Sequence, residues 1–431
     1  MRPALLSLHL GQKILKFESS GTNYHPEMKK RIFIAIHYLE IGGAEISLIG
    51  LMQSIDYSRY DVDLFVFSHR GEFMDLVPPS VNVLPENKVY ACLEVPVSEA
   101  LLRGHFLLAF RRVLAKLRYR SYCRRHRVEG NNYPLHHIIA ETVLPVLPSL
   151  KKYGQYDMAI SFLQPHNFVL EKVDAKKKIC WIHTDYSSIG TIHEDEERIW
   201  AGYDHIISIS EAVSESFRKA FPSLGGKLVI MHNILSKEFV VARSESVGGD
   251  VVQKEMPKEE DVLNLLSIGR FCEAKNYDNV PDICRRIIES GCKVRWFLIG
   301  YGSDESLIRE KIAEAGMEKN VIILGKKSNP YPYIKACDVY VQPSRYEGNS
   351  VTVREAQILC RPVVITNYST AYSQVQDGED GFIVPLENDG CAREMSAFLK
   401  DRNRIDRITR EVSARDYTNQ NEIKVLEKLI G

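Results

Sequence analysis

Short apolar runs alternate with helical stretches along this 431-residue chain, and the alternation occurs in two successive series. Parallel strands are buried on both faces, so they read as continuous apolar runs, and their alternation with helices is typical of βαβ units. The expected strands are residues 32–36, 63–68, 158–162, 178–182 and 205–210, then 263–268, 293–299, 321–324, 338–342 and 362–365. The pattern therefore predicts an α/β fold class, with two Rossmann-like, doubly wound domains facing across a cleft.

Changes in local composition indicate the domain boundaries. Residues 236–261 contain charged and glycine-containing stretches with little periodicity, so we expect the linker region there. Residues 28–235 and 262–405 are then the N-terminal and C-terminal Rossmann-like domains. We expect residues 1–27 to be a flexible N-terminal extension, and residues 406–431 to be a C-terminal helix that can cross back to the N-terminal domain.

The balance of charges and the cysteine pattern argue against several classes of protein. Lys plus Arg and Asp plus Glu number 56 each, so no overall positive field favours nucleic acid as a partner. The nine cysteines are scattered without a C-x-x-C pair, which predicts reduced thiols, no disulfides and no structural metal. The N-terminal stretch is too short to span a bilayer and has no convincing cleavage site, so we expect a cytoplasmic protein.

The segment 338–366 carries the most informative motif. An expected strand is followed by a loop with Glu347 and Gly348, and a helix begins near Ser350. The glycine lets the backbone approach a ligand closely, and free N–H groups at a helix start form an anion site suited to a diphosphate. Glu355 can accept hydrogen bonds from ribose hydroxyls, and Glu347 from sugar hydroxyls. Either carboxylate, taken alone, could instead be a solvated group at a helix end.

Glu347 and Glu355, eight positions apart, resemble with their surroundings the E-x7-E motif of the retaining GT-B glycosyltransferases of family 4, also called group 1 transferases. Arg270 and Lys275 follow an expected strand and resemble the basic pair that neutralises the donor diphosphate in that family. The resemblance is close over about residues 263–390.

The N-terminal half resembles the same family more loosely. The Gly42-Gly43 turn is similar to the family's glycine-rich loop near the donor phosphates, although a lone Gly-Gly turn is a weak signal. His183 lies in a segment similar to the family's mid-domain histidine segment, in which the imidazole is close to the transferred sugar. An isolated histidine is more often structural, so its context carries this assignment.

The resemblance implies a hexosyltransferase that takes a UDP- or GDP-sugar donor, needs no metal or other cofactor, and retains the anomeric configuration. The N-terminal domain would bind a saccharide or lipid-linked acceptor, and the C-terminal domain the nucleotide sugar, in cell-surface polysaccharide or glycolipid synthesis. The residues implied in catalysis are Glu347, His183, Arg270 and Lys275. Those implied in donor binding are Gly42, Gly43, Arg270, Lys275, Glu347, Gly348, Asn349, Ser350, Val351 and Glu355.

Two departures from the family pattern leave the donor sugar open. Asn349 and Ser350 stand where an apolar aromatic residue is common, and Cys360-Arg361 precedes the proline where a small residue is usual. A nucleotide-sugar 2-epimerase of the same architecture and a non-catalytic, membrane-associated scaffold remain alternatives. A dinucleotide oxidoreductase is disfavoured, because the first glycine turn lacks the G-x-G-x-x-G spacing.

Residues 103–127 have an unusual local charge, with nine Lys or Arg and no acidic residue. Apolar residues such as Phe106 and Phe110 recur there at helical spacing, which predicts a basic amphipathic helix. Its apolar face either packs on the domain or docks reversibly on an anionic membrane surface.

Two acidic motifs could suggest a bound cation. Asp61-Val62-Asp63 spells D-x-D, but it begins an early strand far in sequence from the donor motifs, so we expect solvated strand-edge acids. Residues 194–197 are an acidic run, which we interpret as a polar helix start rather than a cation site.

Overall fold

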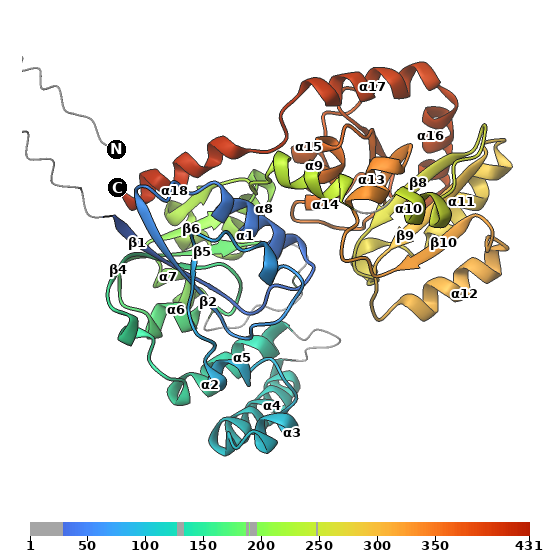
Figure 1. Cartoon of the computed structure of the whole chain (residues 1–431). Coiled ribbons are helices and arrows are strands. Elements are labelled where there is room, and N and C mark those ends of the chain that lie inside the picture. The colour runs from blue at the N-terminus through green and yellow to red at the C-terminus, as the bar shows by residue number, and fades with distance from the viewer. Residues whose placement is uncertain (1–28, 127–132, 187–188, 190–195, 247–248) are drawn as a thin grey trace, which may run out of the picture.

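The computed structural model describes residues 29–126, 133–186, 189, 196–246 and 249–431, so the expected N-terminal extension lies outside the described residues. Two parallel sheets dominate the structure. The first has the strand order β3-β2-β1-β4-β5-β6-β7 and the second the order β10-β9-β8-β11-β12-β13. Figure 1 shows the two sheets in two lobes, each with helices around its sheet. Below, the N-terminal lobe means the first sheet with its helices, and the C-terminal lobe the second.

The strands agree closely with the apolar runs in the sequence. Those of the first sheet are β1 (Lys30–Ile36), β2 (Tyr60–Val66), β3 (Asn82–Val83), β4 (Tyr156–Ser161), β5 (Ala175–Ile182), β6 (His205–Ser208) and β7 (Leu228–Ile230). Those of the second sheet are β8 (Leu263–Ile268), β9 (Val294–Ile299), β10 (Val321–Gly325), β11 (Val339–Gln342), β12 (Val363–Thr366) and β13 (Phe382–Val384). All ten expected strands are therefore confirmed, and β3, β7 and β13 are additional.

The helices connect successive strands. In the first part of the chain they are α1 (Gly43–Gln53), α2 (Lys88–Ala91), α3 (Val97–Leu102), α4 (Phe106–His126), α5 (Tyr133–Val143), α6 (Asn167–Lys172), α7 (Glu196–Ala201), α8 (Glu211–Ala220), α9 (Lys237–Glu245) and α10 (Gly249–Glu255). In the second part they are α11 (Val280–Glu289), α12 (Glu305–Ala315), α13 (Tyr331–Ala336), α14 (Val351–Ile358), α15 (Ala371–Gln374), α16 (Asn388–Lys400), α17 (Arg402–Ala414) and α18 (Ile423–Ile430).

Burial on both faces explains why the central strands are largely apolar. Along β1, Ile32 and Ile34 pack into one hydrophobic cluster, while Phe33 and Ala35 between them pack into a second cluster on the other face. Every residue of β8 is buried as well. In such a sheet only the strand ends are open to a ligand, so function is expected in the loops that follow the strands.

Each sheet has a switch point, where the chain reverses its direction of winding. In the first sheet β1 lies between β2 and β4, and in the second β8 lies between β9 and β11. Ligands of doubly wound sheets bind outside the carboxyl ends of the strands at such points. The loops after β1 and β4, and those after β8 and β11, are therefore the places to examine.

The expected linker region is partly helical. Residues 236–261 carry α9 and α10, and the Ser236 hydroxyl caps α9 by accepting a hydrogen bond from the Phe239 N–H (3.1 Å). The Phe239 ring packs edge-on against Tyr331 of α13, with 5.9 Å between ring centroids. This segment thus packs against the C-terminal lobe.

Residues 406–431, expected to form one helix, contain the second part of α17 and all of α18, and α16 precedes them. Asp401 ends α16 and caps α17, because its side chain accepts a hydrogen bond from the Arg404 N–H (3.0 Å). The last helix, α18, lies against the N-terminal lobe (Figure 1). There Lys177 of β5 donates to the Leu429 carbonyl oxygen (2.7 Å), and Arg59 pairs with Glu427 (3.3 Å).

Candidate functional site

The residues expected to bind the donor surround one cavity of about 410 Å³ between the two lobes. The N-terminal lobe lines it with residues after β1, β5 and β6, and the C-terminal lobe with residues after β8, β9, β10 and β11. All eleven residues implied in catalysis or donor binding line it, namely Gly42, Gly43, His183, Arg270, Lys275, Glu347, Gly348, Asn349, Ser350, Val351 and Glu355. We call this space the interlobe cavity.

Arg270 is an exposed cation of the interlobe cavity. It follows β8 directly, and within the described part of the chain its guanidinium makes no hydrogen bond or ion pair. Its charge is felt by Glu45 and Tyr38 of the N-terminal lobe, where it opposes the rise that burial causes in the pKa of each. An unpaired guanidinium with five donors is well suited to a diphosphate.

Lys275 and Glu347 form an ion pair beside Arg270. The Lys275 Nζ lies 2.5 Å from Glu347 Oε1, and the same oxygen accepts hydrogen bonds from Ser344 Oγ (2.7 Å) and Gln342 Nε2 (3.0 Å). Three donors on one oxygen fix the orientation of the carboxylate and hold it close to the cavity wall. Lys275 ends a short 3-10 turn, after which Asn276 is buried with a left-handed φ of +60°.

Glu355 is a buried carboxylate on α14. Its Oε1 accepts a hydrogen bond from the hydroxyl of Tyr331 (2.7 Å). Burial raises the pKa of Glu355 to about 7, although the Tyr331 hydrogen bond acts in the opposite direction. A ligand whose hydroxyl groups donate hydrogen bonds to this buried carboxyl group would stabilise its ionised form.

The start of α14 is partly satisfied by the protein itself. The Ser350 N–H donates to Gln374 Oε1 (3.0 Å), so this amide is already paired. The amides of Val351 and Thr352, further into the first turn, have no acceptor within the helix, as at every helix start. Both residues line the interlobe cavity, so two amides of this terminus remain for the predicted anion site, which stays a prediction.

Gly348 lets the lobes approach each other at this site, whereas a side chain on Gly43 would make an ordinary contact. A Cβ atom on Gly348 would lie 2.8 Å from the His183 carbonyl oxygen, and one on Gly43 would lie 3.4 Å from Val351 Cγ2. The first distance is too short for any real Cβ atom, so the loop after β11 can pack against the segment after β5 only with glycine at position 348.

Polar contacts link the lobes around these glycines. Ser369 Oγ donates to Asp185 Oδ2 (2.9 Å), and Asn349 Nδ2 donates to the Ile209 carbonyl oxygen (3.4 Å). Lys326 and Glu72 form an ion pair across the interlobe cavity (2.8 Å). Asn349 is among the residues that the sequence implies in donor binding, but the sequence predicts none of these pairs, because each pair joins positions far apart in the chain.

His183 lies at the junction of two cavities. Its ring packs against Phe162, with 4.8 Å between centroids, and burial lowers the pKa of the imidazole to about 4, so it is neutral at physiological pH. Among the described residues the buried Nε2 has no hydrogen-bond partner. His183 lines both the interlobe cavity and a second cavity of about 420 Å³ in the N-terminal lobe.

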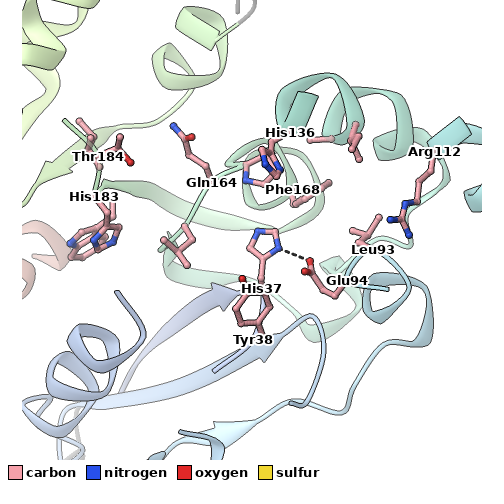
Figure 2. A pocket seen from close by; sticks show the side chains of 16 residues that line it. His37, Tyr38, Leu93, Glu94, Arg112, His136, Gln164, Phe168, His183 and Thr184 are labelled. Atoms are coloured by element: carbon pink, nitrogen blue, oxygen red, sulfur yellow. Dashed lines mark hydrogen bonds and ion pairs between the residues drawn. The ribbon is translucent and has the colours of Figure 1, made fainter. Parts of the chain in front are cut away.

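This second cavity, which we call the N-lobe cavity, lies at the switch point of the first sheet. His37 follows β1, Gln164 lies just after β4, and Thr184 follows β5. Figure 2 shows His183 and Thr184 at one end of the cavity and Arg112 at the other, with the imidazole of His37 between them facing Glu94. His37 Nδ1 and Glu94 Oε1 are 2.7 Å apart.

The basic segment forms α4, as predicted, but its apolar stripe faces solvent. Leu108 and Ala115 of α4 are buried, whereas Leu102 before it is 88% exposed, Phe106 68% and Phe110 63%. The packing of the stripe on the domain, which was one of the two expectations, is thus not observed. No helix in the part of the chain that is described is both long and apolar enough to span a membrane.

The two acidic motifs have structural roles within the described residues. Asp63 pairs with Arg31 (3.0 Å) and accepts a hydrogen bond from Tyr156 (2.6 Å), so it is tied to the sheet rather than solvated. Of residues 194–197, positions 194 and 195 lie outside the described residues. Glu196 begins α7 as expected, but it is buried and accepts a hydrogen bond from Trp200 Nε1 (3.2 Å).

Comparison with known proteins assigns the region that carries most of these residues. Residues 251–415 match the family described as glycosyl transferases group 1. These residues form a group 1 glycosyltransferase domain. WcaL of Salmonella typhimurium, a glycosyltransferase named for colanic acid biosynthesis, is 31% identical over 176 residues, which are 37% of this chain and 42% of WcaL. CapM of Staphylococcus aureus, named for capsular polysaccharide biosynthesis, is 27% identical over 223 residues, 52% of this chain and 56% of CapM.

The match to these curated relatives spans about half of their length, whereas solved structures match along nearly the whole chain. HepE of Anabaena, solved with UDP and glucose, has a TM-score of 0.63 at 17% identity and covers 93% of this chain and 99% of its own. WaaG, a glycosyltransferase of lipopolysaccharide biosynthesis, has a TM-score of 0.64 at 12% identity and covers 93% and 99%. At these identities the likeness concerns the fold alone, and it confirms the expected GT-B architecture around the group 1 glycosyltransferase domain.

Proposed function

We propose that this chain is a retaining glycosyltransferase that moves a hexosyl unit from a UDP- or GDP-sugar to an acceptor hydroxyl, in cell-surface polysaccharide or glycolipid synthesis. One observation carries the proposal: Arg270, Lys275, Glu347 and Glu355 converge on a single cavity between two lobes of the GT-B fold. The relatives named for polysaccharide synthesis and the group 1 domain support the same class of activity.

The charges of the interlobe cavity suit a nucleotide diphosphate sugar without a metal ion. The free guanidinium of Arg270, the ammonium of Lys275 and the first amides of α14 would share the charge that builds on the leaving diphosphate. Glu355 would accept hydrogen bonds from the ribose hydroxyls. In the ligand-free protein the pKa of Glu355 is about 7, because its carboxyl group is buried away from water. Hydroxyl groups of a bound ligand would replace the lost hydration, which supports Glu355 as the ribose-binding group.

Glu347 fits a positioning role better than a nucleophilic one. Its Oε1 accepts from three donors in the ligand-free structure, which lowers its readiness to attack an anomeric carbon. We therefore propose same-face attack by the acceptor hydroxyl, assisted by the departing phosphate, rather than the two-carboxylate double displacement of retaining glycosidases. The neutral imidazole of His183 would contact the transferred sugar.

A thermal-shift screen of sugar nucleotides tests this proposal. A sugar-nucleotide donor present at a hundred times its dissociation constant raises the free energy of unfolding by about 2.7 kcal/mol. Lys275→Ala and Arg270→Ala should abolish the shift, while Lys311→Ala, which removes an exposed lysine on α12, should not. No shift with any UDP- or GDP-sugar would refute the proposal and favour the scaffold alternative. Interconversion of the sugar nucleotide without any acceptor would favour the epimerase.

We also propose peripheral contact with an anionic membrane through residues 103–127. The solvent-facing stripe that contains Phe106 and Phe110 lies on the helix that carries the basic residues, as expected for interfacial binding. Two of the arginines are occupied elsewhere: Arg112 donates to the Cys92 and Val95 carbonyl oxygens (2.7 and 2.6 Å), and Arg118 to Thr142 (2.8 Å).

Vesicle co-sedimentation tests whether the exposed apolar stripe of α4 binds a membrane. Binding to vesicles with phosphatidylglycerol should fall when Phe106 and Phe110 are changed to Ser, and also when Arg111 and Arg120 are changed to Gln. Vesicles of phosphatidylcholine alone should bind weakly, and binding should decrease with salt. Unchanged binding in both pairs of variants would refute the contact.

A further inference from the structure

The N-lobe cavity adjoins the interlobe cavity, and the two share His183. A group held in the N-lobe cavity therefore lies beside a sugar whose anomeric carbon is near His183. This cavity is of the size class of small-molecule sites and opens at the carboxyl ends of β1, β4 and β5. The following inference rests on the function proposed above, since it concerns the group that receives the sugar.

Most of the lining of the N-lobe cavity consists of apolar side chains and uncharged polar groups. Leu163, Phe168 and Trp181 contribute apolar surface. Gln164 and Thr184, both labelled in Figure 2, contribute hydrogen-bonding groups. His136 faces His37 across the space, and burial, then the neighbouring His37, lowers the pKa of His136. A ring with hydroxyl groups on its edge and C–H groups on its faces is the kind of ligand that such a lining can hold.

Among the described residues that line the N-lobe cavity, two carry a fixed charge, Glu94 and Arg112. Arg112 is already occupied, since its Nη1 donates to two backbone carbonyl oxygens of the loop before α3. Burial alone would raise the pKa of Glu94, but the hydrogen bond from His37 and the charges of His37, Arg70 and Arg112 lower it, so Glu94 is an anion at neutral pH. An anionic ligand would therefore meet the partly buried carboxylate of Glu94, while the positive charge of Arg112 is already engaged.

The ionised Glu94 also fixes the orientation of His37. A carboxylate can only accept hydrogen bonds, so His37 Nδ1 must carry the proton in the 2.7 Å contact. His37 Nε2 is then left for a ligand. It accepts from a hydroxyl group when the imidazole is neutral and donates to one when the imidazole is charged, and a hydroxyl group can meet either need.

We propose that the N-lobe cavity is the acceptor subsite, that it takes an uncharged sugar residue, and that the His37–Glu94 pair holds one of its hydroxyl groups. Uronic acids and phosphorylated sugars bind more weakly, because the carboxylate of Glu94 repels their negative charge. His37 is a positioning residue in this scheme, and Glu94 sets specificity.

Saturation-transfer NMR on the full chain tests the proposal without knowledge of the natural acceptor. The probes are methyl glycosides of glucose, galactose, mannose and N-acetylglucosamine, together with the matched methyl uronides of glucose and galactose, each with saturating UDP or GDP. Neutral glycosides should receive saturation from the protein, and the uronides should bind at least tenfold more weakly. Glu94→Gln keeps a hydrogen-bond acceptor for His37 but removes the charge, so it should narrow this difference.

Variants of His37 separate a ligand contact from a structural role. His37→Ala should abolish binding of the neutral glycosides, while its nucleotide binding and unfolding midpoint stay unchanged. His37→Asn, which retains a donor for Glu94 but has no group in place of Nε2, should do the same if the alanine variant unfolds. His69→Ala, which removes an exposed histidine, is the matched control.

The outcomes distinguish this inference from the proposed function. Uronides that bind as tightly as neutral glycosides, neutral glycosides that bind equally to the His37 variants, or no glycoside binding while the nucleotide still binds would each refute the acceptor assignment alone. Failure of the wild-type chain to bind any nucleotide would refute the proposed function, and the acceptor assignment with it.

Discussion

The carboxyl group of Glu355 is expected to destabilise the ligand-free protein at neutral and alkaline pH. Burial raises its pKa from 4.5 to about 7, and each pKa unit corresponds to about 1.36 kcal/mol. The folded state therefore binds a proton that the unfolded state has already released between pH 4.5 and 7. Stability falls as pH rises through this window, by roughly 3 kcal/mol, and then stays level.

Glu355→Gln removes this dependence without changing the shape of the side chain. The amide oxygen still accepts the hydrogen bond from Tyr331, so the variant should match the wild type near pH 4.5 and exceed its unfolding free energy by up to about 3 kcal/mol at pH 8. The amide cannot replace the carboxylate toward ribose hydroxyls, so sugar-nucleotide binding should weaken in the more stable protein.

Urea denaturation at a series of pH values from 4.5 to 8 measures the effect. Glu318→Gln, which removes an exposed carboxylate from the same lobe, is the control and should follow the wild type. The reasoning is refuted if Glu355→Gln shows the wild-type loss of stability between pH 4.5 and 7, because Glu355 would then not be the titrating group.

Three further results are expected. Gly348→Ala should lower kcat/KM about tenfold or more while nucleotide binding persists, because the new Cβ would lie 2.8 Å from the His183 carbonyl oxygen and force the lobes apart; steady-state kinetics that match the wild type would contradict this. The His183 imidazole should titrate near pH 4 by NMR, and a midpoint near 6.5 would contradict its burial. The free energy of unfolding should fall as pH falls from about 6.5 to 4, because in this range the unfolded state binds a proton that the folded state does not. Lys326→Ala should loosen the two lobes by removing the ion pair with Glu72, and small-angle scattering should show a larger radius of gyration without nucleotide; an unchanged radius would show that the pair does not hold the lobes.

The fold was predictable because its central strands are buried on both faces. Strands such as β8 are mostly apolar, with four of its six buried residues Leu or Ile, and a glycine follows its end. By contrast β3, β7 and β13 have two or three residues each. They exist only through pairing with a longer neighbour, and so short a run carries no periodicity of its own.

The interlobe cavity was predictable for a different reason. Arg270 and Lys275 lie five positions apart after one strand, and Glu347 and Glu355 lie on one loop and helix, so each pair is local in sequence. The topology then brings both pairs together, because β8 and β11 are neighbours in the sheet. No such local signal joins His37 to Glu94, which are 57 positions apart, so the N-lobe cavity emerged only from the structure.

The direction in which α4 faces could not be decided from its sequence. Phe106 and Phe110 recur at the spacing of a packed face, yet packing against α5 buries Leu108 and Ala115 instead. A helix with apolar residues on two sides has two ways to pack, and the neighbouring helix decides between them. Because α4 packs in this orientation, the Arg112 side chain points toward the domain and donates a hydrogen bond to the Cys92 carbonyl oxygen.

A crystal structure with a bound, non-hydrolysable UDP- or GDP-sugar tests the central claim most directly. The account predicts the diphosphate within hydrogen-bonding distance of Arg270 and Lys275 at the start of α14, the ribose hydroxyls on Glu355, and the sugar between Glu347 and His183. A nucleotide sugar bound outside the interlobe cavity, or bound within it with Arg270 and Glu355 both turned away, would contradict the account.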